Sequence, residues 1–487
     1  MGLKVSIPTA TDTDGTGRYR QILFSIAFAS FMVNVDTYIV NISLPTIAAA
    51  FHADTADVSW VSMAYQLTVT GFLLIFGRLG DRISIKKIFL FGYAMFTISS
   101  LLCGLSNSLW ALVLSRALQG VGASVLYALT PAMVPRFLPE NMRGPAFGGL
   151  ATAAALGIMV GNPLGGIISG YLSWQWIFYI NIPVGIVAML VCWKVIPNDS
   201  ATAQAERRRI DLPAALLSFL FLLGLMYSLN RVNEYGWRSP LIQGSLALTL
   251  ALLAAFVIRE RKSDAPLLDY TLFRSRSFSS GNVANFMAYA FLAGNNFIIP
   301  FYLVIVKGLT PEKAGLALLV YSLVFVWVGP LAGQLSKRIH PRNLCTAALV
   351  LGAVLSLSFS QILKMPGMTP VLCYFALLAV TFATFLPSNN NVIMGMAPAN
   401  RQGLVSASFR MVGRIGMTFG VCLFETIFSL MIPHQGKTSV LLLRTVPGDT
   451  IMNAFERIYL VGFVLFVIAV IFSLLSRERA ETKVHDL

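Results

Sequence analysis

The chain has 487 residues, of which 56% are apolar and 12% are charged. Because soluble globular proteins carry about 25% charged residues, this composition excludes an ordinary soluble protein and favours one surrounded by lipid. The net charge of +15 would suggest a nucleic-acid partner in a soluble protein, but here the basic residues lie mostly in loops between apolar runs. They therefore indicate membrane topology, and we expect no nucleic-acid partner.

Apolar runs follow one another along the whole chain and predict fourteen transmembrane helices. A spanning helix needs about 20 predominantly apolar residues. The first run, which begins at Gln21, is too long for the core of a signal peptide. We therefore predict an all-α polytopic membrane protein. Its spans, in chain order, are 21–45, 58–77, 88–105, 109–132, 145–170, 175–195, 213–231, 240–258, 278–304, 313–334, 343–363, 370–394, 405–431 and 456–476.

The loops between these spans differ in charge from one side to the other. With the N-terminus in the cytoplasm, the cytoplasmic loops and tails hold most of the 36 Lys and Arg residues. Such a surplus on the cytoplasmic side is the rule for membrane proteins. It predicts a multi-pass protein of the cell membrane (inner or plasma) with both termini in the cytoplasm.

Two sequence patterns occur twice and indicate an internal repeat. Pro139, Gly144, Gly157 and Gly161 recur with the same spacing at Pro398, Gly403, Gly416 and Gly420. The stretch GRLGDRISIKK from Gly77 recurs in a related form, GQLSKRIHPRN, from Gly333. Transporters are often built from repeated halves.

The repeat also predicts how the chain is divided. It pairs the second to fifth spans with the tenth to thirteenth, which is two helices more than two six-helix halves require. We therefore predict an N-terminal six-helix bundle at 1–200, two inserted transmembrane helices with flanking cytoplasmic loops at 201–270, and a C-terminal six-helix bundle at 271–487. We expect the inserted helices to pack outside the twelve-helix core.

Five motifs in chain order carry a resemblance to a known family. The sequence resembles the major facilitator superfamily, and within it the fourteen-helix drug:proton antiporter branch. The motifs are VDTYIVNISLP from Val35, GRLGDRISIKK from Gly77, SRALQGVGAS from Ser115, GIMVGNPLGG from Gly157 and WQWIFYINIPVG from Trp174. Two departures are Asn162, which displaces the usual proline by one residue, and Gln175, where the branch usually has arginine.

Ionisable residues within apolar spans are the candidate proton-coupling groups. Asp36 lies midway along the first span, where a carboxylate needs a wet cavity or a partner and where burial favours its protonated form. The alternative is a structural Asp36 bonded to Asn34, Thr37 or Asn41, or one that gates conformations. Arg116 could pair with Asp36 or another acid, or with backbone carbonyls; the resemblance implies proton coupling for it, and the alternative is a structural ion pair. Glu425 is a second proton site or an anchor for a lipophilic cation, and the alternative is an acid near the outer interface that reaches water.

Other polar residues within the spans are candidates for the wall of a central substrate cavity, against the alternative of hydrogen bonding between helices. They are Asn34, Tyr38, Asn41, Tyr65, Tyr127, Asn295, Asn296 and Asn390. Arg410 and Arg414 lie near the cytoplasmic end of their span, and we expect them to extend toward the interface.

The resemblance implies a conformational latch at the cytoplasmic surface, in the short loop that holds Gly77, Asp81 and Arg82. Asp81 is expected to meet a helix N-terminus or Arg143, and the alternative is a plain topology signal. The antiporter motif implies close helix packing, at Gly157, Gly161, Pro163, Gly165 and Gly166.

The sequence lacks a Walker loop, an HExxH motif and a CxxC pair, so we expect neither an enzyme nor a metal site. We expect no cofactor, with the proton as coupling ion. The resemblance implies proton-coupled efflux of amphipathic, often cationic, drug-like compounds by a protein that works as a monomer in the lipid bilayer. The alternatives are transport of one specific metabolite and, from another class, a membrane receptor or scaffold, which would need larger soluble segments.

Overall fold

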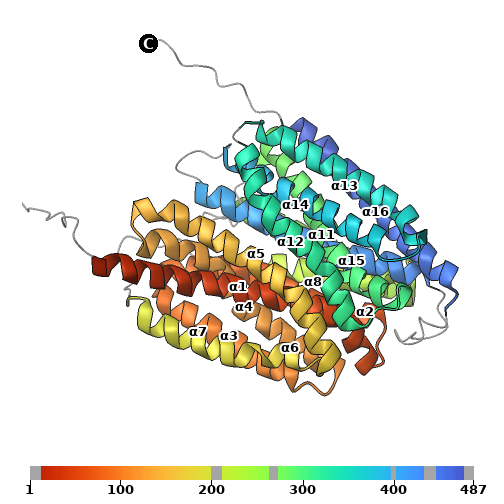
Figure 1. Ribbon diagram of the computed structural model, residues 1–487, viewed down its shortest axis with the longest axis horizontal. Helices are drawn as coiled ribbons and strands as arrows, with labels where there is room; N and C mark the ends of the chain where they lie inside the picture. The colour runs from red at the N-terminus through yellow and green to blue at the C-terminus, as the bar shows by residue number, and fades with distance from the viewer. Residues whose placement is uncertain are drawn as a thin grey trace, which may run out of the picture.

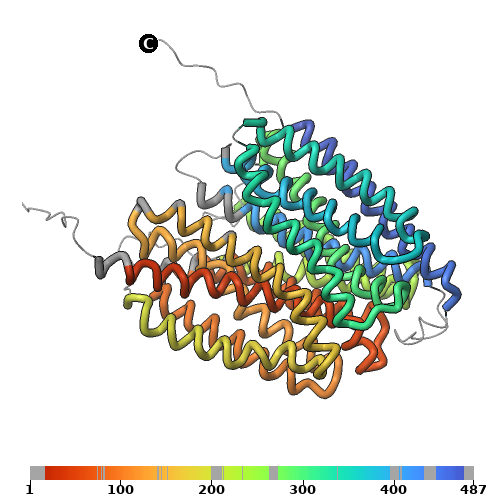
Figure 2. Tube along the Cα trace, in the orientation of Figure 1, coloured from red at the N-terminus to blue at the C-terminus, as the bar shows by residue number. Residues whose placement is uncertain are grey.

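The computed structural model describes residues 13–198, 211–262, 273–336, 338–395, 402–432 and 446–476. Within these segments the chain forms helices joined by short connections, and it forms no strand. The predicted all-α fold is therefore confirmed. Figures 1 and 2 show two bundles of long helices lying side by side, one from the N-terminal and one from the C-terminal part of the chain.

The first bundle contains the helices up to residue 195. They are α1 (Thr13–Ala50), α2 (Thr55–Arg82), α3 (Ile85–Gly104), α4 (Leu109–Phe137), α5 (Glu140–Tyr171), the short α6 (Trp176–Tyr179) and α7 (Asn181–Val195). Polar caps explain several starts: the side chains of Asp54, Ser84 and Ser108 accept hydrogen bonds from backbone amides in the first turns of α2, α3 and α4. Such caps satisfy amides that the helix itself leaves unpaired.

The remaining helices follow the same pattern. They are α8 (Leu212–Tyr235), α9 (Pro240–Lys262), α11 (Arg276–Phe301) with the π-helical turn η1 (Tyr302–Val306), α12 (Pro311–Leu335), α13 (Pro341–Lys364), α14 (Thr369–Gly395), α15 (Gln402–Met431) and α16 (Gly448–Leu475). In the described part of the chain, thirteen helices are long and apolar enough to cross a membrane.

Helix α2 covers the remaining predicted span. It has 28 residues, which is long enough to cross a bilayer. Several of its polar side chains are buried inside the protein, among them Ser59, Ser62, Gln66, Thr68 and Thr70. The polarity of α2 therefore reflects contacts with other helices rather than exposure to water.

The two bundles repeat one packing arrangement. The close pairs α1–α5, α2–α4 and α3–α7 recur as α11–α15, α12–α14 and α13–α16. Contacts between the bundles are paired in the same way, with α2 against α15 and α5 against α12. Interfaces of this crossed kind let one bundle rock against the other in transporters built from repeats.

The two inserted helices differ in their contacts. Helix α8 packs against α2 of the first bundle and α15 of the second, and α9 packs mainly against α8. Trp60 on α2 donates a hydrogen bond of 2.9 Å to the side-chain oxygen of Asn230 on α8. Helix α8 therefore joins the two bundles at their periphery, and α9 lies outside it.

Candidate functional site

A central cavity of about 370 Å³ lies between the two bundles. Helices α1, α2, α4 and α5 line it on one side, and α11, α14 and α15 on the other. Most of its lining is apolar, which is typical of sites for small organic molecules. Its position between the repeated halves is where such transporters bind their substrates.

The cavity extends from the middle of the molecule toward one end, and the helices meet closely at the opposite end. Its lining comes from the middle of α1 and α11, the N-terminal halves of α5 and α15, and the C-terminal halves of α4 and α14. The lining parts of α4, α5, α14 and α15 lie toward the side of the chain's N-terminus. At the other end α5 meets α12: a Cβ on Gly166 would lie 2.5 Å from the Pro311 carbonyl oxygen and 2.9 Å from the Gly315 Cα. This approach requires glycine.

Three of the predicted cavity residues line the cavity: Asn34, Tyr38 and Tyr127. The Tyr127 hydroxyl donates a hydrogen bond of 3.4 Å to the Asn34 side-chain oxygen. Asn34 and Tyr38 are four residues apart, so they lie on the same face of α1. That face is the one that α1 presents to the space between the bundles.

The predictions for Asn41 and Tyr65 as cavity residues are wrong, because both side chains serve contacts within the first bundle. The Asn41 side-chain oxygen accepts a hydrogen bond of 2.9 Å from Ser62 on α2. Tyr65 is 1% exposed, and its ring lies 4.1 Å from the guanidinium carbon of Arg116. Neither residue lines the cavity.

Asn295, Asn296 and Asn390 also lie outside the lining. Asn295 is buried and accepts a hydrogen bond of 2.8 Å from the Tyr459 hydroxyl on α16. Asn390 on α14 is exposed. For Asn295 the alternative of a hydrogen bond between helices is correct.

Arg410 and Arg414 line the cavity, so the expectation that they extend to the membrane interface is wrong. The guanidinium carbon of Arg414 lies 4.0 Å from the centre of the Tyr127 ring, across the gap between the bundles. The reason is the orientation of α15: Gly416 and Gly420 pack against the backbone of α11, and this turns the arginine face toward α1 and α4.

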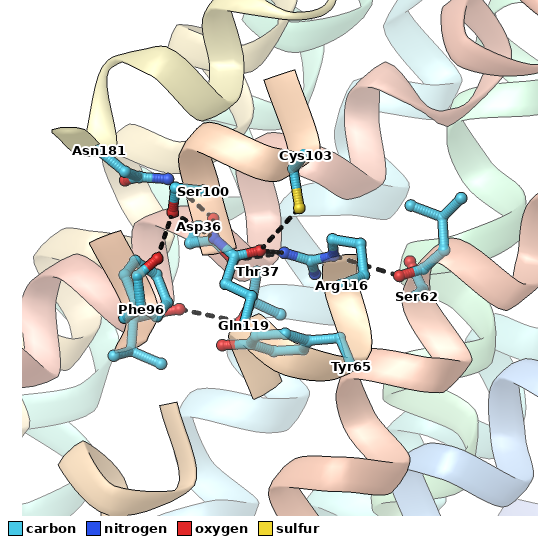
Figure 3. A network of polar contacts seen from close by, with 12 residues as sticks. Asp36, Thr37, Ser62, Tyr65, Phe96, Ser100, Cys103, Arg116, Gln119 and Asn181 are labelled. Atoms are coloured by element: carbon cyan, nitrogen blue, oxygen red, sulfur yellow. Dashed lines mark hydrogen bonds and ion pairs between the residues drawn. The ribbon is translucent and has the colours of Figure 1, made fainter. Parts of the chain in front are cut away.

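Asp36 lies in a buried polar network within the first bundle (Figure 3). Its Oδ2 accepts a bond of 2.7 Å from Arg116 Nη1, with exposures of 0% and 1% for the two side chains. Its Oδ1 accepts bonds of 2.9 Å from Gln119 and from Asn181. The carboxylate is thus held by one cation and two amides, and none of these partners is Asn34, Thr37 or Asn41.

Arg116 links this network to α2. Its Nε donates to the Val61 carbonyl oxygen at 3.2 Å, and its Nη1 also donates to Gln119 Oε1 at 2.5 Å. The pairing with Asp36 and the bond to a backbone carbonyl, which the sequence left open as alternatives, therefore coexist. Charge balance and full hydrogen bonding make such a buried pair tolerable in a medium of low dielectric constant.

Gln119 and Asn181 complete the network and were missed by the sequence analysis. Gln119 lies three residues after Arg116 and so shares its face of α4, a spacing that could have indicated it. Asn181 begins α7, far from Asp36 in sequence, and its position depends on the packing of α7 beside α1 and α3. A single sequence gives no signal for that contact.

Asp36 does not line the central cavity. It lies two residues from both Asn34 and Tyr38 and therefore points to the opposite face of α1. A cationic substrate in this cavity could not contact its carboxylate directly. Its neighbours Thr37 and Tyr38 do line the cavity, so a change at Asp36 reaches the cavity through the backbone of α1.

Glu425 on α15 is fully buried, so the expectation that it reaches water at the outer interface is wrong. Its Oε2 accepts a hydrogen bond of 3.0 Å from Asn230 on α8. Its Oε1 has no hydrogen-bond partner among the described residues. The same Asn230 amide group lies 3.3 Å from Ser59 Oγ on α2, so this carboxyl group stands where both bundles meet the inserted helix.

The latch motif lies at the end of a helix rather than in a loop. Helix α2 continues through Arg82, which places Gly77 in its last turns. The side chains of Asp81 and Arg82 lie outside the described residues, as does Lys337 of the second copy. Arg143 donates to the carbonyl oxygens of Leu138 and Pro135 at the end of α4, at 3.4 and 3.2 Å.

The glycines of the antiporter motif form two contacts. Gly157, Gly161 and Gly165 pack α5 against α1, where a Cβ at Gly161 would lie 2.8 Å from the Cβ of Tyr38. Gly166 packs across the bundles against α12, with Pro163 beside the same Gly315. The motif therefore holds α1 in place beside the cavity and closes the opposite end.

Comparison with known proteins agrees with this architecture. A family model of the Major Facilitator Superfamily matches residues 26–421. The riboflavin transporter RibZ of Clostridioides difficile is 33% identical over 85% of this chain and 90% of its own. The lincomycin resistance protein of Streptomyces lincolnensis is 31% identical over 88% of each chain.

Among solved structures, a bacterial homolog of the human lysosomal transporter Spinster, in its inward-facing and unoccupied conformation, has a TM-score of 0.70. The two chains are 15% identical, over 96% of this chain and 98% of that one. At this identity the likeness concerns the fold.

Proposed function

Because the chain belongs to the Major Facilitator Superfamily, we propose that it is a proton-driven antiporter that exports amphipathic, drug-like compounds across the cell membrane. The observation that carries the proposal is the buried Asp36–Arg116 pair, 2.7 Å apart, beside a cavity formed between two repeated bundles. Ionisable residues inside a membrane bundle mark proton and substrate pathways in transporters.

The cavity supports alternating access. It extends from the middle of the molecule toward the end that holds the N-terminus, while the Gly166–Gly315 contact closes the other end. With the N-terminus in the cytoplasm, as the distribution of basic residues predicts, this arrangement is an inward-facing one that loads its substrate from the cytoplasm. Rocking the bundles about the α2–α15 and α5–α12 interfaces would open the other end.

Coupling at Asp36 then acts through conformation rather than through competition for one site. A proton on Asp36 removes its negative charge and leaves the Arg116 guanidinium without a counter-charge in the described part of the network. Arg116 also contacts α2 through Val61 and Tyr65, so the loss of the pair changes how α1, α2 and α4 pack. The proton and the substrate would thus act on opposite faces of α1, and both would shift the same equilibrium between two packing arrangements of the bundle.

We propose Glu425 as a second proton site. A buried carboxyl group with one amide donor is costly to ionise, because burial penalises the charged form and no ion pair of the described residues offsets it. It also contacts α8 and lies against α2, so its protonation state bears on the contact between the bundles. The two sites would sense the same conformational change at different places.

The test is transport in proteoliposomes with an imposed pH gradient and no ATP. Riboflavin serves as the first substrate, together with compounds of different charge chosen from the drug susceptibility of cells that lack or overproduce the protein. We expect substrate movement to follow the gradient in the wild type, and Asp36→Asn to abolish this dependence while the protein remains folded. Transport that required ATP and ignored the gradient would contradict the proposal.

The second candidate is transport of one specific metabolite, which one relative favours. That relative is a riboflavin transporter, and it is as similar to this chain as the antibiotic resistance proteins are. The susceptibility panel separates the two functions. A shift for several unrelated compounds supports drug efflux, and no shift for any of them supports a dedicated metabolite transporter.

A further inference from the structure

Two arginines on α15 face the central cavity from the second bundle. Arg410 and Arg414 are four residues apart, so their guanidinium groups lie one above the other on one helix face. Arg414 stacks on Tyr127 at 4.0 Å, and the Tyr289 ring lies beside the adjoining Gly413. Within the described part of the chain, no carboxylate forms an ion pair with either arginine.

Arg410 is exposed and Arg414 is half-buried. Their like charges repel each other within one cavity, and an anion placed between them would remove this repulsion. Arginine does not lose its proton in proteins, so the pair cannot relieve the repulsion by becoming neutral. The face of the Tyr127 ring offsets part of the cost for Arg414. The described residues that line the cavity therefore carry a net positive charge.

The rest of the lining is mostly apolar or aromatic, with Ser30, Asn34, Thr37 and Thr130 as uncharged polar side chains, and carries no acidic side chain among the described residues. Tyr38 and Phe147 come from the first bundle, and Leu292 and Phe409 from the second. A ligand that satisfies both parts of the lining has a flat or bulky apolar body and one anionic group. The resemblance to drug:proton antiporters implied cations, which this lining repels.

We propose that the cavity selects amphipathic organic anions, with the apolar body against the aromatic lining and a carboxylate, sulfonate or phosphate group between Arg410 and Arg414. Planar guanidinium groups bind such oxyanions through paired hydrogen bonds, which makes arginine better suited than lysine to this role. The inference rests on the proposed function in one respect, namely that the central cavity is the transport site.

The experiment uses three probes that share a pyrene body and differ in charge: 1-pyreneacetate, 1-pyrenemethanol and 1-pyrenemethylammonium. Equilibrium binding is measured by fluorescence with the full-length protein in phosphatidylcholine nanodiscs, and binding to empty nanodiscs is subtracted. We expect the anion to bind about 10- to 100-fold more tightly than the cation, since a hydrogen bond to a charged group contributes about that much. Equal binding of all three, tighter binding of the cation, or binding of none overturns the proposal.

Variants locate the preference on the two arginines. Arg410→Gln and Arg414→Gln should each lower the affinity for 1-pyreneacetate, and the double variant should erase the preference for the anion. Arg414→Lys should retain part of it, because the charge remains. The control is Arg457→Gln, which removes a positive charge from an exposed position on α16 and should leave the preference unchanged. Thermal unfolding of each variant shows whether it is folded, and a control that lost the preference would overturn the assignment.

Two further measurements distinguish this proposal from lipid binding and from failure of the antiport mechanism. If replacing a tenth of the phosphatidylcholine by phosphatidylglycerol abolishes 1-pyreneacetate binding, the anion site belongs to a lipid headgroup and the proposal fails. Binding is measured without a pH gradient, so it is independent of coupling. A wild type that prefers the anion but transports without regard to the gradient would contradict the antiport mechanism and leave the present inference standing.

Discussion

Asp36 and Glu425 are both buried carboxyl groups of transmembrane helices, yet their surroundings differ in kind. Asp36 has an arginine at 2.7 Å and two amide donors, all from its own bundle. Glu425 has one amide donor, at 3.0 Å, and that donor comes from the inserted helix α8. The first site suits a carboxylate that is charged and balanced, whereas the second suits a carboxyl group that carries a proton in this conformation.

The difference teaches that buried carboxyl groups inside the membrane are accommodated in two ways in this molecule. Within a bundle, opposite charges are paired and the pair joins neighbouring helices. Between the bundles, where surfaces must separate and meet again, a single carboxyl group contacts a neutral amide. A neutral contact is easier to break repeatedly, because separating it exposes no unbalanced buried charge.

The largest effect should come from breaking the ion pair on one side. Arg116→Met leaves the Asp36 carboxylate buried without its cation, and we expect a loss of about 3–5 kcal/mol of stability. The thermal unfolding temperature in detergent, followed by tryptophan fluorescence, measures this loss at constant pH. The matched control, Arg457→Met on the exposed side of α16, should unfold close to the wild type.

The double variant Asp36→Asn/Arg116→Met sharpens this first test. It removes both charges, so much of the lost stability should return, although transport should not. If Arg116→Met alone unfolds like the wild type, Asp36 is not ionised in the folded protein, and the contrast with Glu425 disappears.

A smaller effect is expected at the other carboxyl group. Asn230→Ala removes the single side chain that donates to Glu425 among the described residues, and we expect a loss of about 1–3 kcal/mol of stability. Glu425→Gln keeps the shape of the side chain and should change stability by less than about 1 kcal/mol, because it replaces a neutral group by another one. Thermal unfolding of both variants, with transport assayed across pH, measures the two expectations.

The comparison between the two carboxyl groups fails if Glu425→Gln destabilises the protein as strongly as Arg116→Met. Such a result would mean that Glu425 is charged and paired. Retained stability together with a lost pH dependence of transport would instead support a proton at this site.

The fold could be predicted from the sequence further than the site could. Apolar runs and loop charges depend on composition along the chain, and they indicated the helices through to α16. Which face of a helix points inward depends on packing partners. The hydrophobic pattern indicates how deep Arg410 and Arg414 lie in the membrane, so they were placed at the interface. The direction in which their side chains point is set by the contact of Gly416 and Gly420 with α11, which the pattern does not show.

The same limit applies to the polar network around Asp36. A pairing with Arg116 was among the predicted alternatives, because both are charged residues within apolar runs and must be balanced. Asn181 could not be predicted, since it is brought to Asp36 by the packing of α7. Asn41 was misplaced for a related reason: its face of α1 turns to Ser62 on α2 rather than to the cavity.

The smallest expected effect concerns a contact between the bundles that carries no charge at all. Gly166 on α5 meets Gly315 on α12 at the closed end, and a Cβ there would lie within 3.0 Å of two backbone atoms. Gly166→Val should therefore disfavour closure of this end by about 1 kcal/mol, a roughly fivefold change in the ratio of the two conformations.

Spin labels at Tyr171 and Lys313, on the ends of α5 and α12, report the distance across this contact by electron paramagnetic resonance. The variant should gain a population with a longer distance, whereas Gly148→Val, on the same helix with open space around it, should match the wild type. Identical distance distributions for all three proteins would show that this contact does not control closure, and the charged and amide contacts at Asp36 and Glu425 would then remain as the elements that do.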